Sequence, residues 1–277
     1  MSRAMLFALS ACLVLAAAYA SAAEQPQSLT LRFGAETRSY SAADLLARAD
    51  AATISIPLDS SYGKPMTYRA VPLKGLLAGL PVHGADAVQA AAHDGFVAEI
   101  PTALLTAPGG AVPWVAIDGP AEKWPNLPGK SASAGPFYLV WEHPERSRIM
   151  SEQWVTELDS VAGVRSPEKR WPQLKVSASA SGQVRHGMAA YVTQCLPCHQ
   201  LYGAGSGTMG PDLGRPMNAS AYTSPAGLKA LTRNPRAVRF WPAMQMGGFS
   251  TKALPDADLD AIVAYLQYKA AHAVGAN

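Results

Sequence analysis

The sequence predicts an α+β domain followed by an all-α domain, and three observations give this fold class. Up to about residue 164, apolar and polar residues alternate in several short stretches, the pattern of half-buried strands, with short helical patterns between them. Residues 166–182 form a Pro- and Ser-rich segment without periodicity, which indicates a linker. Beyond this segment, over residues 183–277, the apolar pattern is helical.

Length and composition narrow the class of protein. The 277 residues suffice for about two domains, and a hydrophobic content of 49% argues against disorder. The formal net charge of +3 lacks the basic excess of a nucleic-acid-binding protein. Residues 24–182 carry 14 Lys and Arg against 16 Asp and Glu, whereas residues 183–277 carry 8 against 4, and this asymmetry can steer a partner.

The first 23 residues have the pattern of a secretory signal peptide. Arg3 precedes an apolar run from Met5 to Ala20, and small residues follow, with cleavage expected after Ala22 or Ala23. The run is shorter than the ~20 residues that span a bilayer, so a membrane anchor is the less favoured interpretation. We expect an exported, soluble protein with no stable membrane span after cleavage.

Residues 24–165 are expected to form the α+β domain. Ser41 and Asp44 make a capping box that opens a short helix with Leu45 and Leu46 facing inward, and Pro72 starts a second helix. The second helix carries an apolar stripe of Leu73, Leu76, Leu77 and Leu80. Asp94-Gly95 predicts a hairpin turn between strands at Val88–Ala92 and Phe96–Ile100. Further strands are expected at Leu29–Phe33, Ile54–Leu58, Trp114–Ile117, Phe137–Trp141 and Trp154–Leu158.

The strongest chemical signal is Cys195-Leu196-Pro197-Cys198-His199. Two thiols at this spacing can each form a thioether with one vinyl group of a haem, and the adjoining imidazole is then held against the iron as proximal ligand. A structural zinc site needs four ligands, and Cys12, the remaining cysteine, leaves with the signal peptide. The motif therefore predicts one covalently bound haem c, held by Cys195 and Cys198, with His199 as a metal ligand.

Residues 183–277 resemble the class I c-type cytochromes. Gly187 and Tyr191 match the first half of that family's helix crossing, and Ile262 and Tyr265 match the second half. The segment from Gly210 to Leu213 is similar to the family's Gly-Pro-x-Leu segment. The resemblance implies that the Pro211 carbonyl accepts a hydrogen bond from the other nitrogen of His199, which fixes the tautomer of the imidazole.

The sixth iron ligand is expected to be a methionine late in the chain. Met209 and Met217 follow His199 too closely to reach the far face of the haem, which leaves Met244 and Met246. Met246-Gly-Gly-Phe249 resembles the family's Met-Pro-x-Phe stretch, so Met246 is preferred and Met244 is the alternative. The basic residues Arg233, Arg236 and Arg239 precede this stretch. They either bind a haem propionate or dock an acidic partner, or they form an ordinary solvated helix face.

The first domain contains three segments in a characteristic order, at Val71–Leu77, His93–Pro101 and Gly135–Val140. In this order they resemble a shortened molybdopterin-binding domain of sulfite-oxidase-like enzymes. Those enzymes hold molybdenum through a cysteine thiolate, and residues 24–165 contain no cysteine, so no molybdenum is expected. Trp114, Trp141 and Trp154 are expected to pack in the core rather than line a pocket.

Together these features predict a periplasmic monohaem cytochrome c that carries single electrons between redox protein partners. The first domain would serve for docking or ligand binding. Electron transfer is favoured over catalysis, because the first domain offers no catalytic dyad, nucleophile or metal cluster in its sequence. Two alternatives stay open: a haem-coupled small-molecule dehydrogenase similar to sulfite oxidase, and a haem ligand sensor or peroxidase with an open sixth position.

Overall fold

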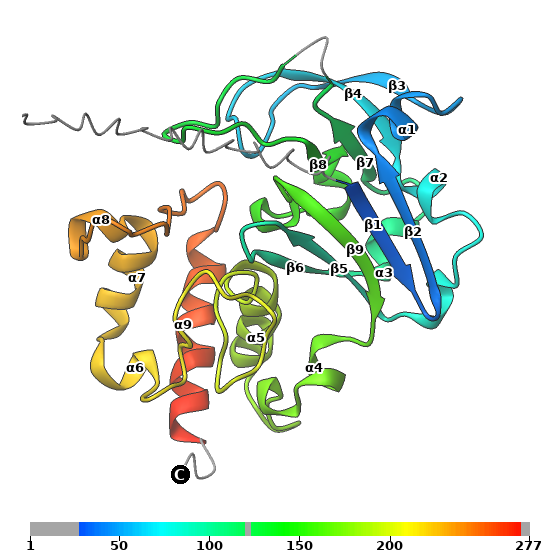
Figure 1. Ribbon diagram of the computed structural model, residues 1–277. Helices are drawn as coiled ribbons and strands as arrows, with labels where there is room; N and C mark the ends of the chain where they lie inside the picture. Colours follow the sequence, from blue (N-terminus) through cyan, green and yellow to red (C-terminus); the bar gives the residue numbers. More distant parts are fainter. Residues whose placement is uncertain (1–27, 120–122, 273–277) are drawn as a thin grey trace, which may run out of the picture.

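The computed structural model describes residues 28–119 and 123–272, so the expected signal peptide lies outside the described residues. A β-rich region with two sheets comes first, and helices follow toward the C-terminus (Figure 1). This arrangement confirms the predicted order of a mixed region before a helical one. In the part of the chain described here, no helix is long and apolar enough to cross a membrane.

The larger sheet has five strands in the order β2-β1-β9-β5-β6. Its strands are β1 (Ser28–Phe33), β2 (Glu36–Ser41), β5 (Ala87–Ala92), β6 (Val97–Pro101) and β9 (Leu158–Val164). β1 and β9 run parallel, and the other neighbours are antiparallel. The predicted hairpin is confirmed, since β5 and β6 pair around Gly95, whose φ of +94° suits glycine.

The second sheet has four antiparallel strands in the order β3-β4-β7-β8. Its strands are β3 (Ala52–Ile56), β4 (Met66–Pro72), β7 (Val112–Ile117) and β8 (Phe137–Glu142). Trp141 on β8 is fully buried, and its indole nitrogen donates to the carbonyl of Gln153 at 2.8 Å. Trp141 therefore packs in the core as predicted, but Trp141 and Trp154 also line a pocket, so the prediction that they do not is wrong. The neighbouring Glu142 accepts a hydrogen bond from the Trp114 indole.

Short helices join these strands: α1 (Ala42–Leu46), α2 (Leu73–Leu77) and α3 (Thr102–Thr106). The predicted capping box is present, because the Asp44 N–H donates to Ser41 Oγ at 3.1 Å and the Ser41 N–H donates to Asp44 Oδ2 at 2.8 Å. α2 starts one residue later than predicted. Pro72 pairs with Trp114 at the end of β4 and so remains in the sheet.

The prediction of a strand over Trp154–Leu158 is wrong in its position. Trp154 ends the 3-10 turn η3 (Ser151–Gln153), and β9 starts only at Leu158. The reason is tertiary, since β9 is held between β1 and β5, and its register is set by those partners. Leu58, expected at the end of the second predicted strand, lies beyond β3 and is 46% exposed.

Residues 166–182, the expected linker, contain α4 (Pro167–Arg170) and the 3-10 turn η4 (Pro172–Leu174). Arg170 forms an ion pair with Glu99 of β6 at 2.5 Å. On the other side, Leu174 is fully buried and its carbonyl accepts from the Tyr265 hydroxyl at 2.7 Å. The connection is thus packed against both parts of the chain, because it carries apolar and charged side chains that find partners there.

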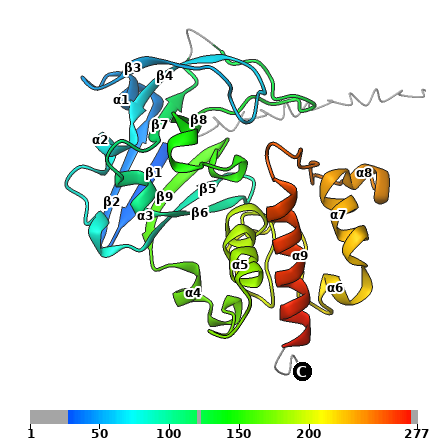
Figure 2. The same cartoon turned by 180° about the vertical axis from the view of Figure 1, so that it is seen from behind.

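The C-terminal region consists of α5 (Gly182–Gln194), α6 (Ala219–Tyr222), α7 (Pro225–Arg233), α8 (Pro235–Val238) and α9 (Asp256–Ala271). α5 and α9 pack against each other, and α6 to α8 lie on the other side of α9 (Figures 1 and 2). Gly187 permits the close approach of α5 to α9, since a Cβ there would collide with the Ala261 carbonyl oxygen. The rings of Tyr191 and Tyr265 contact each other at this crossing, tilted by 51° with centroids 5.5 Å apart.

Candidate haem-binding site

The end of α5 gathers the two motif cysteines and the histidine. Cys195 caps the helix and donates its N–H to the Tyr191 carbonyl at 2.9 Å. The N–H groups of Cys198 and His199 then both donate to the Cys195 carbonyl, at 3.2 and 2.9 Å. This tight turn brings two free thiols and one imidazole together at the same end of the helix.

Pro211 orients the imidazole of His199. Nδ1 of His199 lies 2.8 Å from the Pro211 carbonyl oxygen, and because a carbonyl only accepts, Nδ1 carries the proton. The lone pair is then on Nε2, the form that can bind iron. Burial lowers the pKa of His199, which further favours the neutral ring.

The segment that carries Pro211 packs directly on the motif. The Gly210 N–H donates to the Cys198 carbonyl at 2.8 Å, and a Cβ at Gly210 would collide with the imidazole ring. Asp212 holds the same segment by accepting from the N–H groups of Tyr202, Gly203 and Gly214 at 2.6–2.9 Å. The motif and this loop therefore form one hydrogen-bonded unit.

Both thiols are protonated at neutral pH. Burial raises the pKa of Cys195 and that of Cys198 to about 12, and the nearby carboxyl of Glu152 adds to both shifts. Burial likewise raises the pKa of Glu152 itself to about 7. Glu152 comes from the N-terminal region, some 40 residues before the motif, and no pattern in the sequence points to it.

The candidate methionines lie on two different segments. Met209 Sδ is 3.8 Å from Cys198 Sγ. Met244 and Met246 lie on the loop between α8 and α9, where Met244 is buried and Met246 is half-buried. Arg233 stabilises the end of this loop, since it donates to the carbonyls of Phe249 and Ser250 and pairs with Asp256 at 2.6 Å.

The segment between Leu213 and Met244 exposes large apolar side chains. They are Met217, Tyr222, Val238, Phe240 and Trp241. Arg236 and Arg239 lie over the rings of Phe240 and Trp241, at 5.6 and 5.0 Å from the ring centroids. Phe240 and Trp241 are adjacent in the chain, and apolar side chains gathered at a surface are typical of a binding site, which a large flat prosthetic group could cover.

The N-terminal region contacts the motif from β5, β6 and η3. The Val97 N–H of β6 donates to the Pro197 carbonyl at 3.0 Å, and the Thr208 N–H donates to the Gly95 carbonyl at 3.2 Å. Gln89 Nε2 donates to Ser206 Oγ at 2.9 Å. The hairpin was predictable from Asp94-Gly95, whereas its contact with the cysteine motif, about 100 residues away, was not.

A family model described as Cytochrome c matches residues 184–269. The matched range starts in the first turn of α5 and ends in the last turn of α9, and it includes Cys195, Cys198, His199 and Pro211. The match supports a C-terminal c-type cytochrome domain, which implies covalently bound haem c and an electron-carrier role. A comparison with curated proteins finds no match.

Proposed function

We propose that this protein is an exported cytochrome c with one haem, which carries single electrons between redox protein partners. The observation that carries the proposal is the unit of Cys195, Cys198 and His199 with the Pro211 carbonyl 2.8 Å from Nδ1. Two thiols and a correctly protonated imidazole at one helix end are the donor set that a covalent haem requires.

The residues of the unit have separate roles in this proposal. Cys195 and Cys198 would hold the haem by thioether bonds, and His199 would bind the iron through Nε2. Pro211 fixes the orientation of the His199 ring, which keeps the structural reorganisation during electron transfer small. When bound, the haem supplies reversible one-electron exchange at its iron.

Met246 is the proposed sixth ligand, and Met244 is the alternative. A thioether opposite histidine raises the reduction potential and suits an electron carrier. Both lie on the loop between α8 and α9, which Arg233 anchors. Phe240 and Trp241 lie on the same loop and are exposed, and a haem bound beside the methionines would cover apolar surface of this kind.

The N-terminal region is proposed to dock a partner or bind a ligand, as a shortened sulfite-oxidase-like domain without molybdenum. Its contacts with residues 194–208 place it beside the cysteine motif, where a docked partner would be near the haem. Export to the periplasm, with residues 1–23 as signal peptide, remains part of this proposal, and so do the domain boundaries at 24–165 and 183–277.

Absorption spectroscopy tests the axial ligand. The ferric protein should show a weak near-infrared band from sulfur-to-iron charge transfer, and Met246→Ala should abolish it while Met244→Ala retains it. The reverse pattern would assign the ligand to Met244. Rapid carbon monoxide binding to the reduced wild-type protein would show that the sixth position is open. This result would contradict the electron-carrier proposal and favour a sensor or peroxidase.

Metal analysis separates the carrier from the dehydrogenase alternative. We expect about one iron per chain and no molybdenum, because the N-terminal region has no cysteine to hold it. Molybdenum in stoichiometric amount would overturn this part of the proposal.

A further inference from the structure

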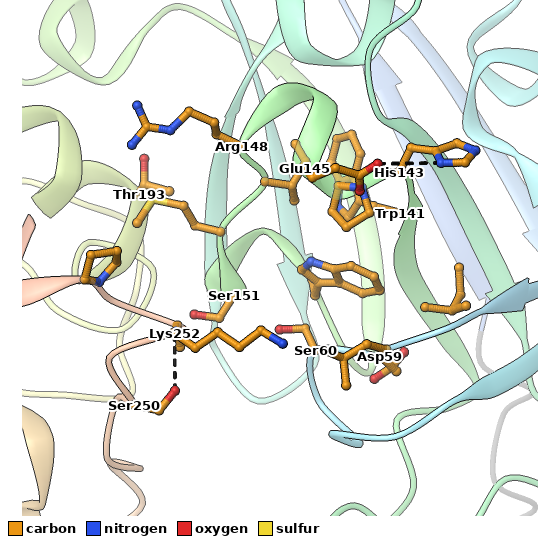
Figure 3. A pocket seen from close by; sticks show the side chains of 18 of the residues that line it. Asp59, Ser60, Trp141, His143, Glu145, Arg148, Ser151, Thr193, Ser250 and Lys252 are labelled. Carbon is orange, nitrogen blue, oxygen red and sulfur yellow. Dashed lines mark hydrogen bonds and ion pairs between the residues drawn. The ribbon is translucent and has the colours of Figure 1, made fainter.

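A pocket of about 1160 Å³ lies between the N-terminal region and the first helix of the C-terminal region. On one side it is lined by the end of β3 with the loop after it, and by the segment after β8. The other side is lined by α5, the loop at residues 250–255 and the first turn of α9 (Figure 3). Cys195, Cys198 and His199 do not line it, so the pocket is separate from the candidate haem site.

The acidic side chains of the pocket are largely engaged by other groups. Asp59 accepts from the hydroxyl groups of Tyr68 and Tyr138, and Glu142 accepts from the Trp114 indole at 2.7 Å. Two more pairs complete the set, Asp258 with His186 at 2.6 Å and Glu145 with His143 at 3.7 Å. Each of these carboxyl groups therefore has a hydrogen-bonding or ion-pairing partner within the protein.

The two permanent cations of the pocket have no such partner. Within residues 28–119 and 123–272, neither Arg148 nor Lys252 forms an ion pair. In Figure 3 the Arg148 guanidinium lies on the side of Thr193 of α5, and the Lys252 side chain extends toward Ser60 of the opposite wall. Both residues are exposed, and their charged groups lie in different parts of the pocket.

Unusual backbone geometry is found in the segment after β8, which carries Arg148. Arg148 and His143 have φ of +50° and +53°, in the left-handed region that non-glycine residues rarely adopt. They are two of the four non-glycine residues with positive φ in the described part of the chain. Such conformations are unfavourable and cluster at ligand-binding sites, where the surrounding structure maintains them.

The remaining walls are mostly apolar. They include Ile56, Leu58, Ile149, Met150, Trp154 and Ala190. Leu58 is 46% exposed, a large apolar side chain left facing solvent at the pocket mouth. A ligand for this site would combine an anionic group for the cations with an apolar body for these walls.

We propose that the pocket binds a small organic anion, a carboxylate that pairs with Arg148 and has an apolar body that lies along the apolar walls. This ligand site goes beyond electron transfer and does not depend on the haem. Both halves of the chain contribute to it, so the bound anion would also hold the two regions together.

The test is isothermal titration calorimetry on the full-length, haem-loaded protein. The probe is 2-naphthoate, and its uncharged analogue 2-naphthamide is the matched control ligand. We expect 2-naphthoate to bind and 2-naphthamide to bind at least about tenfold more weakly, because the amide offers no charge to the cations. Absence of 2-naphthoate binding, or equal affinity for both compounds, would overturn the proposal.

Variants then locate the site. Arg148→Gln should weaken 2-naphthoate binding about tenfold, and Lys252→Gln, in another part of the pocket, should weaken it less. Arg146→Gln is the control, since Arg146 is an exposed neighbour that does not line the pocket. Circular dichroism and the haem spectrum show whether each variant is folded. Wild-type affinity in the folded Arg148→Gln variant would also overturn the proposal, whatever the result for the haem.

Discussion

The Val97 N–H, at the outer edge of β6, donates a 3.0 Å hydrogen bond to the carbonyl of Pro197, between the two cysteines of the motif. This bond ties the N-terminal region to the middle of the candidate haem-attachment segment. We expect Val97→Pro to remove the donor without disturbing the sheet, because proline is tolerated at the start of an edge strand. Hydrogen exchange of the peptide covering residues 194–208, measured by mass spectrometry, should become faster.

Val97→Ala is the matched control for this bond, since it shortens the side chain and keeps the N–H. It should leave exchange in residues 194–208 close to the wild-type rate. Equal exchange in the proline and alanine variants would show that the bond does not hold the two regions together.

Gly210 should be intolerant of alanine because its Cβ would collide with the His199 imidazole. Gly210→Ala is expected to displace the ring from Pro211, weaken the bond to iron and lower the reduction potential or the fraction of six-coordinate haem. Potentiometry with absorption spectroscopy measures both. Gly182→Ala is the control, since no atom lies within 4 Å of a Cβ at that position. An unchanged potential and spectrum in Gly210→Ala would contradict the proposed packing.

Gly187 should be equally restrictive at the crossing of α5 and α9. A Cβ there collides with the Ala261 carbonyl oxygen and lies 2.9 Å from Tyr265 Cβ. We expect Gly187→Ala to lower the free energy of unfolding by about 3 kcal/mol, at the upper end of typical overpacking effects. Urea denaturation measures it, and Gly182→Ala in the same helix should be neutral or slightly stabilising. A loss below about 0.5 kcal/mol would mean that the helices can separate at little cost.

The backbone conformation of Arg148 is expected to lower the stability of the protein, while its side chain contributes to ligand binding. Its φ of +50° favours glycine, so Arg148→Gly should raise the free energy of unfolding by about 1 kcal/mol relative to Arg148→Ala. Both variants lack the guanidinium and should bind 2-naphthoate equally weakly. Thermal and urea denaturation of the pair provide the comparison. If the glycine variant is no more stable than the alanine variant, the conformation of Arg148 is not strained.

Asp59 should make stability depend on pH. Burial raises the pKa of this carboxyl above its ordinary value of 3.8, although hydrogen bonds from Tyr62, Tyr68, Ser61 and Tyr138 act in the opposite direction. The folded protein then binds the proton more tightly than the unfolded chain. The stability from this group is present below pH 3.8 and is lost as the pH rises through the folded-state pKa.

Asp59→Asn removes that titration. The free energy of unfolding of the wild type minus that of Asp59→Asn should therefore decrease as the pH is raised from about 3.8, in urea denaturation at a series of pH values. A difference that increases over the same range would show that hydrogen bonds, and not burial, dominate the pKa of Asp59.

Local signals in the sequence predicted local structure well. The capping box of Ser41 and Asp44 forms as expected, and so does the hairpin at Asp94-Gly95. The Cys195–His199 motif and Pro211 also meet, because the turn after α5 and the following loop are short and hydrogen-bonded to each other. These features depend on residues that are close in the chain.

Features set by distant partners were not predictable. β2 is a mostly polar edge strand without apolar alternation, and its pairing with β1 defines it. β9 lies several residues later than its apolar residues suggest, because β1 and β5 fix its register. Arg148 and Lys252 are about 100 residues apart, and the pocket that they share exists only once the two regions pack.

Haem retention after denaturation tests the central proposal most directly. The purified protein, denatured and extracted with acidified acetone, should keep about one haem per chain, whereas the Cys195→Ser/Cys198→Ser double variant should release or lack it. A wild-type chain that gives up its haem, or that never carries one when produced with a cytochrome c maturation system, would contradict the account.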